Sequence, residues 1–460
     1  MFQSLDDMIA AAATPPGIGG LAVIRISGSG VFDTVSPIFK SKSDLRTAAS
    51  HTIHYGNLIS SDHKIIDEVL ISVFRSPRSY TTQDSIEISC HGGPVIVQSI
   101  LNRLIEIGIR LAEPGEFTKR AYLNGRLDLS QAESVADLIH STSQLSQQSS
   151  LYQLSGSYST RLKQIRQDLI DFISLLELEL DFSDEDVEFA SRDSLIKKLN
   201  EIIDYVNRLV NSFSTGRFIK EGARVVIAGK PNAGKSTLLN VLLGHDRAIV
   251  SEIPGTTRDT IEESINLDGI PFRFIDTAGI RETDDFVEQR GVERTLENIN
   301  RANILLYLYD RSIGLAEDEI KNIELFRNKN SQLKIALIAN KSDLGKFNQN
   351  LQLNEYSNIE ISAYQEKGID QLILWLKDVL LGQQSLSEAT ESITNVRHYS
   401  SLVRVSENLK KALSGVESNN SQDFISSDIR AALFELGSIT GETTTDDILN
   451  NIFSKFCIGK

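Results

Sequence analysis

The residues most clearly suited to chemistry form a glycine-rich run, Gly-Lys-Pro-Asn-Ala-Gly-Lys-Ser, at positions 229–236. In this Gly-x-x-x-x-Gly-Lys-Ser spacing the glycines let backbone N–H groups curl around phosphate oxygens. Lys235 would reach the outer phosphates, and the Ser236 hydroxyl would ligate Mg²⁺ at the positive end of the helix that follows. The alternative is a glycine turn without a ligand. The full spacing between a strand-like and a helical run instead favours a nucleoside triphosphate site.

Two segments farther along the chain indicate the base. Asn340-Lys-Ser-Asp343 follows the buried-type run 334–339. An aspartate there can accept hydrogen bonds from N1–H and the exocyclic amine of guanine, a donor pair that adenine lacks. Ile361-Ser-Ala363 ends another short strand and resembles the segment whose backbone contacts the guanine oxygen in GTPases. Each segment is weak alone, but together with the phosphate loop they favour GTP over ATP.

Two segments between these are placed to sense the γ-phosphate. Asp276-Thr-Ala-Gly279 follows the alternating run 271–275, so Asp276 can hold Mg²⁺ through water and Gly279 can offer its N–H to the γ-phosphate. In the loop from Ser251 to Asp259, Thr257 can place its hydroxyl on Mg²⁺, and Gly255 lets the loop order and disorder. The alternative for this loop is a surface connection without a role.

The residue after Gly279 is Ile280, where many GTPases carry a glutamine that orients the attacking water. Isoleucine cannot hydrogen-bond, so water positioning must come from elsewhere, and the run 281–288 offers several carboxylates. Asn232 supplies a side-chain carbonyl close to the expected phosphate oxygens. We hypothesise that a monovalent cation held there replaces the positive charge of an arginine finger.

The elements that must position these residues can be read from hydrophobic spacing. Strands alternate with helices over residues 222–383, which predicts a mostly parallel sheet with ligand loops at the carboxyl ends of its strands. Strands near 21–27 and 68–74 with a helix near 94–107 predict a small α+β domain. Apolar stripes predict long core-facing helices on both sides of the nucleotide-binding module, as if it were inserted into a helical domain. These stripes lie within 162–180, 196–210, 405–413 and 429–436.

Composition limits the function classes further. A chain of 460 residues is too long for one core. Cys90 and Cys457 are its two cysteines, which favours a reducing, cytoplasmic compartment, and no long apolar span predicts a membrane segment. The formal net charge of −15 repels nucleic acid, so any RNA contact must use a local basic patch or a partner's surface.

With these motifs in place, the chain resembles the bacterial tRNA-modification GTPase family MnmE, also called TrmE, from end to end. The resemblance rests on a set of N-terminal motifs, on Gly255-Thr-Thr-Arg-Asp259 and on the terminal Phe456-Cys-Ile-Gly-Lys460. The N-terminal motifs are Thr14-Pro-Pro-Gly17, Gly19-Gly20, Ile24-Arg-Ile-Ser-Gly28, Ser79-Tyr-Thr81, Glu87, His91-Gly-Gly93, Glu113-Pro-Gly-Glu-Phe-Thr118 and Leu127-Asp-Leu-Ser-Gln-Ala-Glu133.

The resemblance implies a multidomain α+β and α/β protein in which a Ras-like P-loop GTPase domain interrupts an all-α domain. The expected boundaries are 1–122 for a tetrahydrofolate-binding and dimerisation domain, 123–221 and 384–460 for the helical domain, and 222–383 for the G domain. It implies a homodimer that works with the FAD protein MnmG (GidA) in a heterotetramer or larger complex. The complex would add an aminomethyl or carboxymethylaminomethyl group to carbon 5 of the wobble uridine of certain tRNAs. The carbon would come from 5,10-methylene- or 5-formyl-tetrahydrofolate, and FAD would belong to the partner.

The resemblance also implies roles for individual residues. GTP hydrolysis would depend on K⁺ and on pairing of two G domains, with Glu288 orienting water through a bridging water and Lys235 as the second catalytic residue. Mg²⁺ would be held by Ser236 and Thr257, and K⁺ by Asn232, Ser251, Ile253 and Thr256. The expected GTP-binding set is Asn232, Ala233, Gly234, Lys235, Ser236, Thr237, Ser251, Glu252, Ile253, Pro254, Gly255, Thr256, Thr257, Asp276, Thr277, Ala278, Gly279, Asn340, Lys341, Asp343, Ser362 and Ala363.

The implied folate set is Arg25, Glu87, Arg126 and Lys460. A carboxylate can accept hydrogen bonds from a pterin, and cations suit the anionic glutamate tail. The sequence departs from the family at Ile18, often polar there, at Thr82-Gln83, where Gly-Glu is common, and at Arg126, where Lys also occurs.

Cys457 allows two interpretations. A thiol near a folate and a uridine can attack carbon 6 of the base. The favoured alternative is a small buried residue in a tail that packs on the folate domain of the partner subunit.

Two other functions remain open: a ribosome-assembly switch that reads RNA shape, and a dimer scaffold with vestigial hydrolysis. The folate-type domain and the terminal Cys-Ile-Gly-Lys argue against the first. Lys235, Ser236, Asp276 and Glu288 argue against the second.

Overall fold

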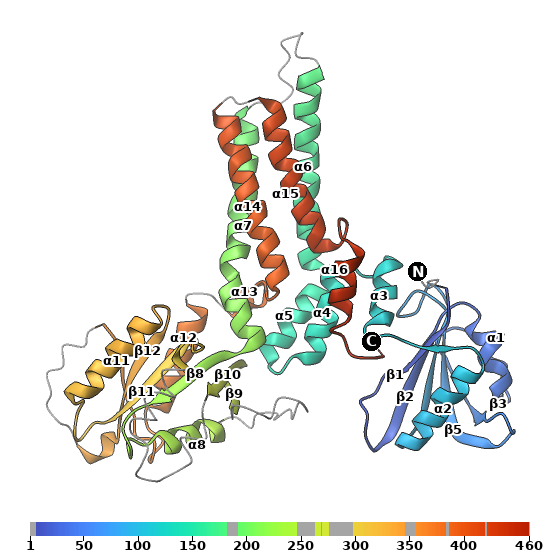
Figure 1. Ribbon diagram of the computed structural model, residues 1–460, viewed down its shortest axis with the longest axis horizontal. Coiled ribbons are helices and arrows are strands. Elements are labelled where there is room, and N and C mark those ends of the chain that lie inside the picture. The colour runs from blue at the N-terminus through green and yellow to red at the C-terminus, as the bar shows by residue number, and fades with distance from the viewer. Residues whose placement is uncertain are drawn as a thin grey trace. The chain divides into compact units, whose positions relative to one another are not determined.

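The computed structural model describes residues 6–181, 192–245, 263–267, 269–275, 298–345, 355–382, 386–418 and 421–459. The chain forms two compact units. One comprises Met1–Ala136, Gln153–Ile196 and Glu407–Lys460, and the other comprises Asp137–Tyr152 and Lys197–Ser406. Each unit is described by itself (Figure 1). Within the described ranges, no helix combines the length and the apolar character needed to cross a membrane.

The first unit begins with a seven-stranded sheet in the order β3-β4-β5-β6-β2-β1-β7. Its neighbours are antiparallel except for the parallel pair β1 and β7. The strands are β1 (Ile9–Ala12), β2 (Gly19–Ser27), β3 (Phe39–Ser41), β4 (Thr52–Ile59), β5 (Ile65–Phe74), β6 (Ser85–Gly92) and β7 (Arg110–Leu111).

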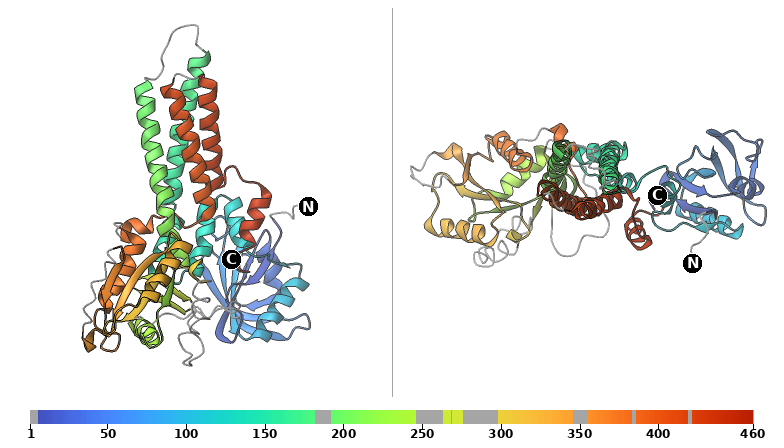
Figure 2. Two further views of the ribbon diagram at one scale, coloured as in Figure 1. Left: turned by 60° about the vertical axis from the view of Figure 1, so that its left-hand side comes forward. Right: turned by 90° about the horizontal axis from the view of Figure 1, so that it is seen from above.

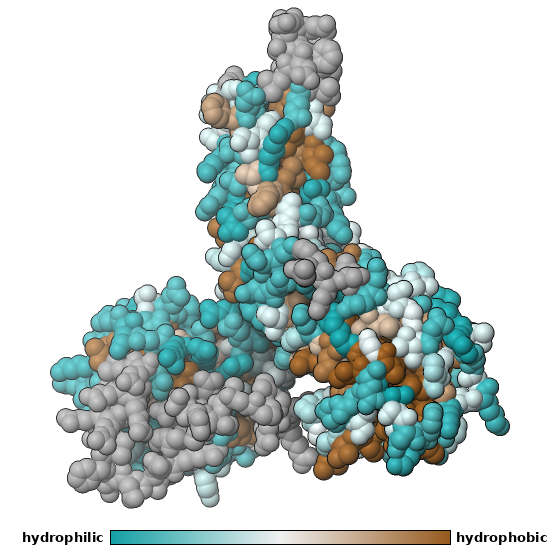
Figure 3. All heavy atoms as spheres, turned by 45° about the vertical axis from the view of Figure 1, so that its right-hand side comes forward, coloured by the Kyte–Doolittle hydropathy of each residue, from teal (hydrophilic) through white to brown (hydrophobic). Residues whose placement is uncertain are grey.

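One face of this sheet is covered and the other carries exposed apolar side chains. Strand residues such as Ile24, Ile71 and Ile88 join the core with Ile100 and Leu104 of α2 (Pro94–Glu106) and with the short α1 (Val31–Val35) and η1 (Ser36–Ile38). This alternation buries every second residue, as half-buried strands do. The exposed large apolar residues of the sheet are Leu21, Ile53, Tyr55, Ile65, Leu70 and Leu111. Figure 3 shows hydrophobic surface gathered on this part of the molecule.

Helices complete the first unit. The long helices α6 (Ser157–Asp181) and α15 (Gln422–Thr440) pack along one another. A small apolar cluster joins the start of α4 (Leu129–His140), through Leu129 and Ala132, to Leu449 and Phe453 of α16 (Asp446–Phe453) and to Phe456. The C-terminal tail is therefore anchored to the helices that follow α3 (Glu116–Leu123).

The second unit contains a six-stranded sheet in the order β13-β12-β11-β8-β10-β9. All neighbouring pairs are parallel except β9 with β10. The strands are β8 (Ala223–Ala228), β9 (Glu263–Leu267), β10 (Ile270–Ile275), β11 (Ile304–Asp310), β12 (Lys334–Asn340) and β13 (Ser357–Glu360). This confirms the predicted mostly parallel sheet.

Helices cover both faces of this second sheet (Figure 2). One core contains apolar residues of α8 (Lys235–His245) and α12 (Ile369–Leu381), together with Leu145 of α5 (Gln144–Leu154). The opposite core contains Ile323 and Phe326 of α11 (Glu317–Lys329). Because both faces are buried, β11 and β12 read as continuous apolar runs, not alternating ones.

This unit also contains α13 (Leu386–Thr390) and the short η3 (Ser342–Leu344). It includes α7 (Arg192–Glu221) from Lys197 onward and α14 (Val396–Glu417) up to Ser406. Phe213 of α7 stacks on Tyr399 of α14, with ring centroids 4.3 Å apart. The predicted apolar stripes at 196–210 and 405–413 therefore lie on real helices, and the polar stretch 383–391 contains the short α13.

Candidate functional site

The loop after β8 has the backbone that a phosphate loop needs. Gly229 has φ 141°, and a Cβ there would collide with the Leu308 carbonyl of β11. Gly234 has φ 97°, and a Cβ there would collide with the Asn340 side chain. Both glycines are thus fixed by backbone conformation and by close neighbours. Asn232 lies at the turn with φ 62°, and α8 begins at Lys235.

The lysine of this loop lies folded back across it. Lys235 Nζ donates to the carbonyls of Gly229 and Lys230, each at 2.9 Å. Burial lowers the pKa of Lys235 below its usual 10.5, because a charged ammonium is poorly solvated there. An incoming phosphate would supply the negative charge that this partly buried cation lacks.

Asn340, at the end of β12, joins the phosphate loop to the segment expected to contact the base. Its Nδ2 donates to the Ala233 carbonyl at 2.8 Å, and its Oδ1 accepts from the Ala363 N–H at 3.0 Å. Asn340 is 3% exposed, so both contacts are shielded from water and costly to lose. The side chain of Asn340 therefore connects the loop after β8 to the loop after β13.

The next residues present an oriented carboxylate. Asp343 Oδ1 accepts a 2.6 Å hydrogen bond from the Ser362 hydroxyl. Lys341 has a left-handed backbone, φ 62°, and its Nζ lies 2.8 Å from Asp310 Oδ2 at the end of β11. Desolvation raises the Asp310 pKa, but bonds from Lys341 and Ser312 outweigh it and the pKa is lowered. Asp310 therefore stays ionised and holds Lys341 in place.

A cavity of about 570 Å³ lies beside these loops. It is lined from α8 by Thr237, Asn240 and Val241, and from the loop after β13 by Ala363, Tyr364 and Glu366. All the predicted GTP-binding residues that the structure describes lie on these loops and the first turn of α8: Asn232–Thr237, Asn340, Lys341, Asp343, Ser362 and Ala363. Residues 251–257, Asp276–Gly279 and Glu288 lie outside the described residues.

Three members of the predicted folate set lie together in the first unit. Arg25 of β2 and Glu87 of β6 are direct cross-strand partners, and Arg25 Nη2 lies 2.8 Å from Glu87 Oε1. Arg25 Nη1 is buried and has no hydrogen-bond partner within the part of the chain that the structure describes. A buried donor without a partner is costly and fits an acceptor on a ligand.

Tyr80 connects this ion pair to the third member. The Arg25 guanidinium carbon lies 5.0 Å from the Tyr80 ring centroid, and that of Arg126 lies 4.9 Å from the same centroid. Arg126 Nη1 also donates to the Tyr80 carbonyl at 2.6 Å, and the Tyr80 hydroxyl lies 2.9 Å from the Thr118 hydroxyl. Lys460 lies outside the described residues.

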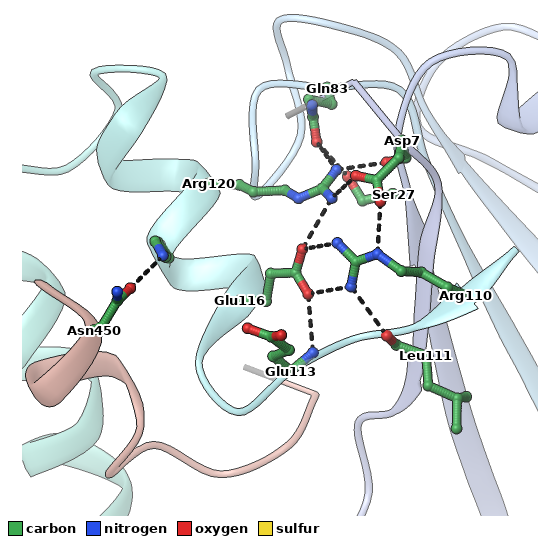
Figure 4. A network of polar contacts seen from close by, with 10 residues as sticks. Asp7, Ser27, Gln83, Arg110, Leu111, Glu113, Glu116, Arg120 and Asn450 are labelled. Atoms are coloured by element: carbon green, nitrogen blue, oxygen red, sulfur yellow. Dashed lines mark hydrogen bonds and ion pairs between the residues drawn. The ribbon is translucent and has the colours of Figure 1, made fainter. Parts of the chain in front are cut away.

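A partly buried network of Arg110, Arg120, Glu116 and Asp7 contacts Gln83, three residues after Tyr80 (Figure 4). Arg110 makes two bonds to Glu116, at 2.8 and 2.6 Å. Arg120, 1% exposed, bonds to Glu116 and Asp7 and donates to the Gln83 carbonyl oxygen Oε1 at 3.2 Å. Gln83 thus meets the charged Arg120 with a neutral amide acceptor.

Backbone strain gathers at the two candidate sites. Six non-glycine residues have a left-handed φ in the described ranges, and five of them lie at one of these sites: His51, Thr82, Asn232, Lys341 and Glu366. Such conformations cost free energy and tend to persist where function requires them. The exception, His63, lies in the turn between β4 and β5.

Sequence reasoning missed three features. Tyr80 belongs to the quoted Ser79-Tyr-Thr81 motif, but no pattern in the sequence shows that two guanidinium groups, those of Arg25 and Arg126, lie over its ring. The tie made by Asn340 and the Asp310–Lys341 pair join segments far apart in the chain. The sequence does contain one signal for these two contacts: Asp310 and Asn340 are polar residues at the ends of apolar strands. Cys90 is buried and Cys457 is exposed in the structure. Burial of Cys457 against a partner subunit stays a prediction.

The parallel sheet with helices on both faces and the glycine loop leading into α8 define a P-loop nucleotide-binding protein with a Ras-like domain. Two family models match the chain: "MnmE helical domain" over residues 129–457 and "GTP-binding protein TrmE N-terminus" over residues 8–126. The chain belongs to the MnmE family of tRNA modification GTPases.

Individual relatives are similar to this chain over almost its whole length. The tRNA modification GTPase MnmE of Cytophaga hutchinsonii is 47% identical over 99% of this chain and 98% of the relative. That of Christiangramia forsetii is 45% identical, with 100% of both chains covered. The solved G domain of the T. maritima FeoB iron transporter covers 34% of this chain and 96% of its own, with 18% identity and a TM-score of 0.25, too low to carry an inference.

Proposed function

We propose that this chain hydrolyses GTP as the nucleotide-driven component of a tRNA-modifying complex. The observation that supports it most is the hydrogen-bonded tie from Ala233 through Asn340 to Ala363, because it holds a phosphate loop and a base-binding loop in one site. The phosphates would lie on the backbone N–H groups at the start of α8, with Lys235 turned toward them. In this proposal Asp343 accepts the two donors of guanine while Ser362 holds its other oxygen.

For the metal ions, the proposal uses oxygen donors. Mg²⁺ would be held by the Ser236 hydroxyl in the first turn of α8 and by Thr257, a hard donor set that suits this ion. K⁺ would be held by Asn232, Ser251, Ile253 and Thr256, supplying the positive charge that an arginine finger gives elsewhere. Glu288 would orient the attacking water in place of a glutamine at Ile280.

In the first unit we propose a reduced-folate site at Arg25, Glu87, Arg126 and Lys460. The buried, unpartnered Arg25 Nη1 and the cavity beside Arg126 fit a polar aromatic ligand with an anionic tail. The folate would supply the one-carbon unit added to carbon 5 of the wobble uridine. Glu87 and Arg25 would orient the pterin, and Arg126 and Lys460 would bind the tail.

The proposal includes a cytoplasmic homodimer that acts on tRNA with the FAD protein MnmG, with FAD on the partner. The domain boundaries follow the same assignment: 1–122, 123–221 with 384–460, and 222–383. Full-length relatives named as tRNA modification GTPases favour this function over a ribosome-assembly switch.

Steady-state GTP turnover in matched Na⁺, K⁺ and NH₄⁺ buffers tests the catalytic part. We expect K⁺ to stimulate the wild type, Asn232→Ala to lose that stimulation, and Glu288→Ala to lose turnover while still binding GTP. Equal GTP turnover in Na⁺ and K⁺ would contradict a role for K⁺ in hydrolysis. Full turnover by Glu288→Ala would contradict the proposal that Glu288 orients the attacking water.

A further inference from the structure

A cavity of about 520 Å³ adjoins the proposed folate site. Its lining includes two arginines and a histidine, Arg78, Arg126 and His51, and the rings of Phe74 and Tyr80, but no carboxylate among the described residues. A concave site with several cations and no anion of its own favours an anionic ligand.

The chain holds this cavity in shape at an energetic cost. His51 and Thr82, both lining it, each have φ 63°. The His51 N–H donates to the Val73 carbonyl at 2.7 Å, and its ring meets Phe74 edge-on at 5.4 Å between centroids. Asn124, which also lines the cavity, donates from Nδ2 to the Thr81 carbonyl at 2.7 Å. Strained lining residues, held with their neighbours by hydrogen bonds, indicate a formed site.

The Tyr80 ring connects the cavity to the Arg25–Glu87 ion pair. Tyr80 lines the cavity, and the guanidinium groups of Arg25 and Arg126 both lie over that ring, at 5.0 and 4.9 Å. Arg126 lines the cavity, whereas Arg25 pairs with Glu87 on the sheet. A ligand oriented at Glu87 would pass Tyr80 and reach the cationic cavity with its other end.

We propose that this cavity binds the γ-linked oligoglutamate extension of a reduced folate, with Arg78 and His51 contacting carboxylates beyond the first glutamate. The assignment rests on the proposed folate site. Each added glutamate brings one carboxylate, and arginine pairs with carboxylates through two parallel hydrogen bonds. The aminobenzoyl ring of the ligand would lie near Tyr80, between the pterin end and the tail.

Calorimetric titration of the full-length chain with 5-formyl-tetrahydrofolate as the monoglutamate and as the γ-linked triglutamate tests this. We expect the triglutamate to bind about tenfold more tightly. Arg78→Gln should reduce that ratio to about twofold or less, and Arg78→Lys should retain part of it. Arg78 is exposed, so neither change disturbs the core. The matched control Lys64→Gln, in an exposed turn of the same unit, should keep the full ratio.

Equal affinity for the two folates would overturn the tail assignment while leaving the folate site standing. A triglutamate preference that Arg78→Gln leaves intact would overturn the role of this cavity. No binding of either folate would contradict the folate site itself. Titrations with tRNA and with inorganic phosphate complete the set. If Arg78→Gln weakens either of them but not the triglutamate, the cavity is a phosphate site and the proposal is wrong.

Discussion

Asn340 is hydrogen-bonded to Ala233 in the phosphate loop, 107 residues earlier in the chain, at 2.8 Å. Its other side-chain atom accepts from the Ala363 N–H at 3.0 Å. One amide thus makes the phosphate loop and the base-binding loop interdependent. Loss of this amide should disturb nucleotide affinity at both ends, although Asn340 is not itself the residue expected to recognise guanine.

Replacing Asn340 by alanine should weaken binding of both GDP and GTP by about 10- to 100-fold. The change leaves the Ala233 carbonyl and the Ala363 N–H without their buried partner, and each such loss costs about 1–3 kcal/mol. Fluorescent guanine nucleotides titrated into the two proteins would measure it. Asn328→Ala, at an exposed position on α11, is the matched control and should bind as the wild type does. Wild-type affinity in Asn340→Ala would show that the tie is dispensable.

Tyr80 should contribute to folate binding through its ring more than through its hydroxyl. Tyr80→Ala removes the ring over which Arg25 and Arg126 lie, and we expect about a tenfold loss of 5-formyl-tetrahydrofolate affinity. Tyr80→Phe keeps the ring and loses only the contact with Thr118, so it should stay within about threefold of the wild type. Calorimetry distinguishes the two. Equal effects of both changes would assign the role to the hydroxyl.

Glu116 should make the first unit sensitive to acid. Burial raises the Glu116 pKa, but bonds from Arg110, the Glu113 N–H and Arg120 outweigh it, and the pKa lies below its usual 4.5. A lowered carboxylate pKa adds stability above the unfolded value, and this stability is lost as the pH falls through the folded value. Glu116→Gln should therefore cost about 3–5 kcal/mol at neutral pH and less in acid.

Pulse proteolysis across a urea series at neutral and at acid pH would measure this for the N-terminal segment. Glu113→Gln alters an exposed neighbouring carboxylate and should leave the urea midpoint unchanged. If Glu116→Gln shifted the urea midpoint equally at both pH values, the ion pairs of Glu116 with Arg110 and Arg120 would not be the source of the stability.

Much of the fold could be predicted from the sequence because burial leaves a periodic trace. The expected strands at 224–228, 304–309 and 334–339 are apolar throughout, apart from the first residues Arg224 and Lys334, and the structure has β8, β11 and β12 there. Strand β1, Ile-Ala-Ala-Ala, has no such trace, since alanine has low strand propensity. It is a strand only because β2 and β7 pair with it on either side.

The two candidate sites also differ in how far the sequence predicts them. The phosphate loop could be predicted because its residues are contiguous and their spacing is dictated by phosphate chemistry. The approach of both Arg25 and Arg126 to the Tyr80 ring depends on β2, the segment before β6 and the turn after α3 meeting in space, which no local pattern records. The family resemblance brought Arg25, Glu87 and Arg126 together as a set, and the structure adds the ring that connects them.

Base selection by Asp343 tests the central claim most directly, because it depends on the whole site being a guanine site. Competition binding of GTP, ATP and XTP should show the wild type preferring GTP by at least about 100-fold. Asp343→Asn should reverse this in favour of XTP, since an amide donates to the xanthine 2-oxygen where the carboxylate accepted from the guanine amine. Asp370→Asn, an exposed aspartate of α12, should keep the GTP preference. An unchanged GTP preference in Asp343→Asn would contradict the account.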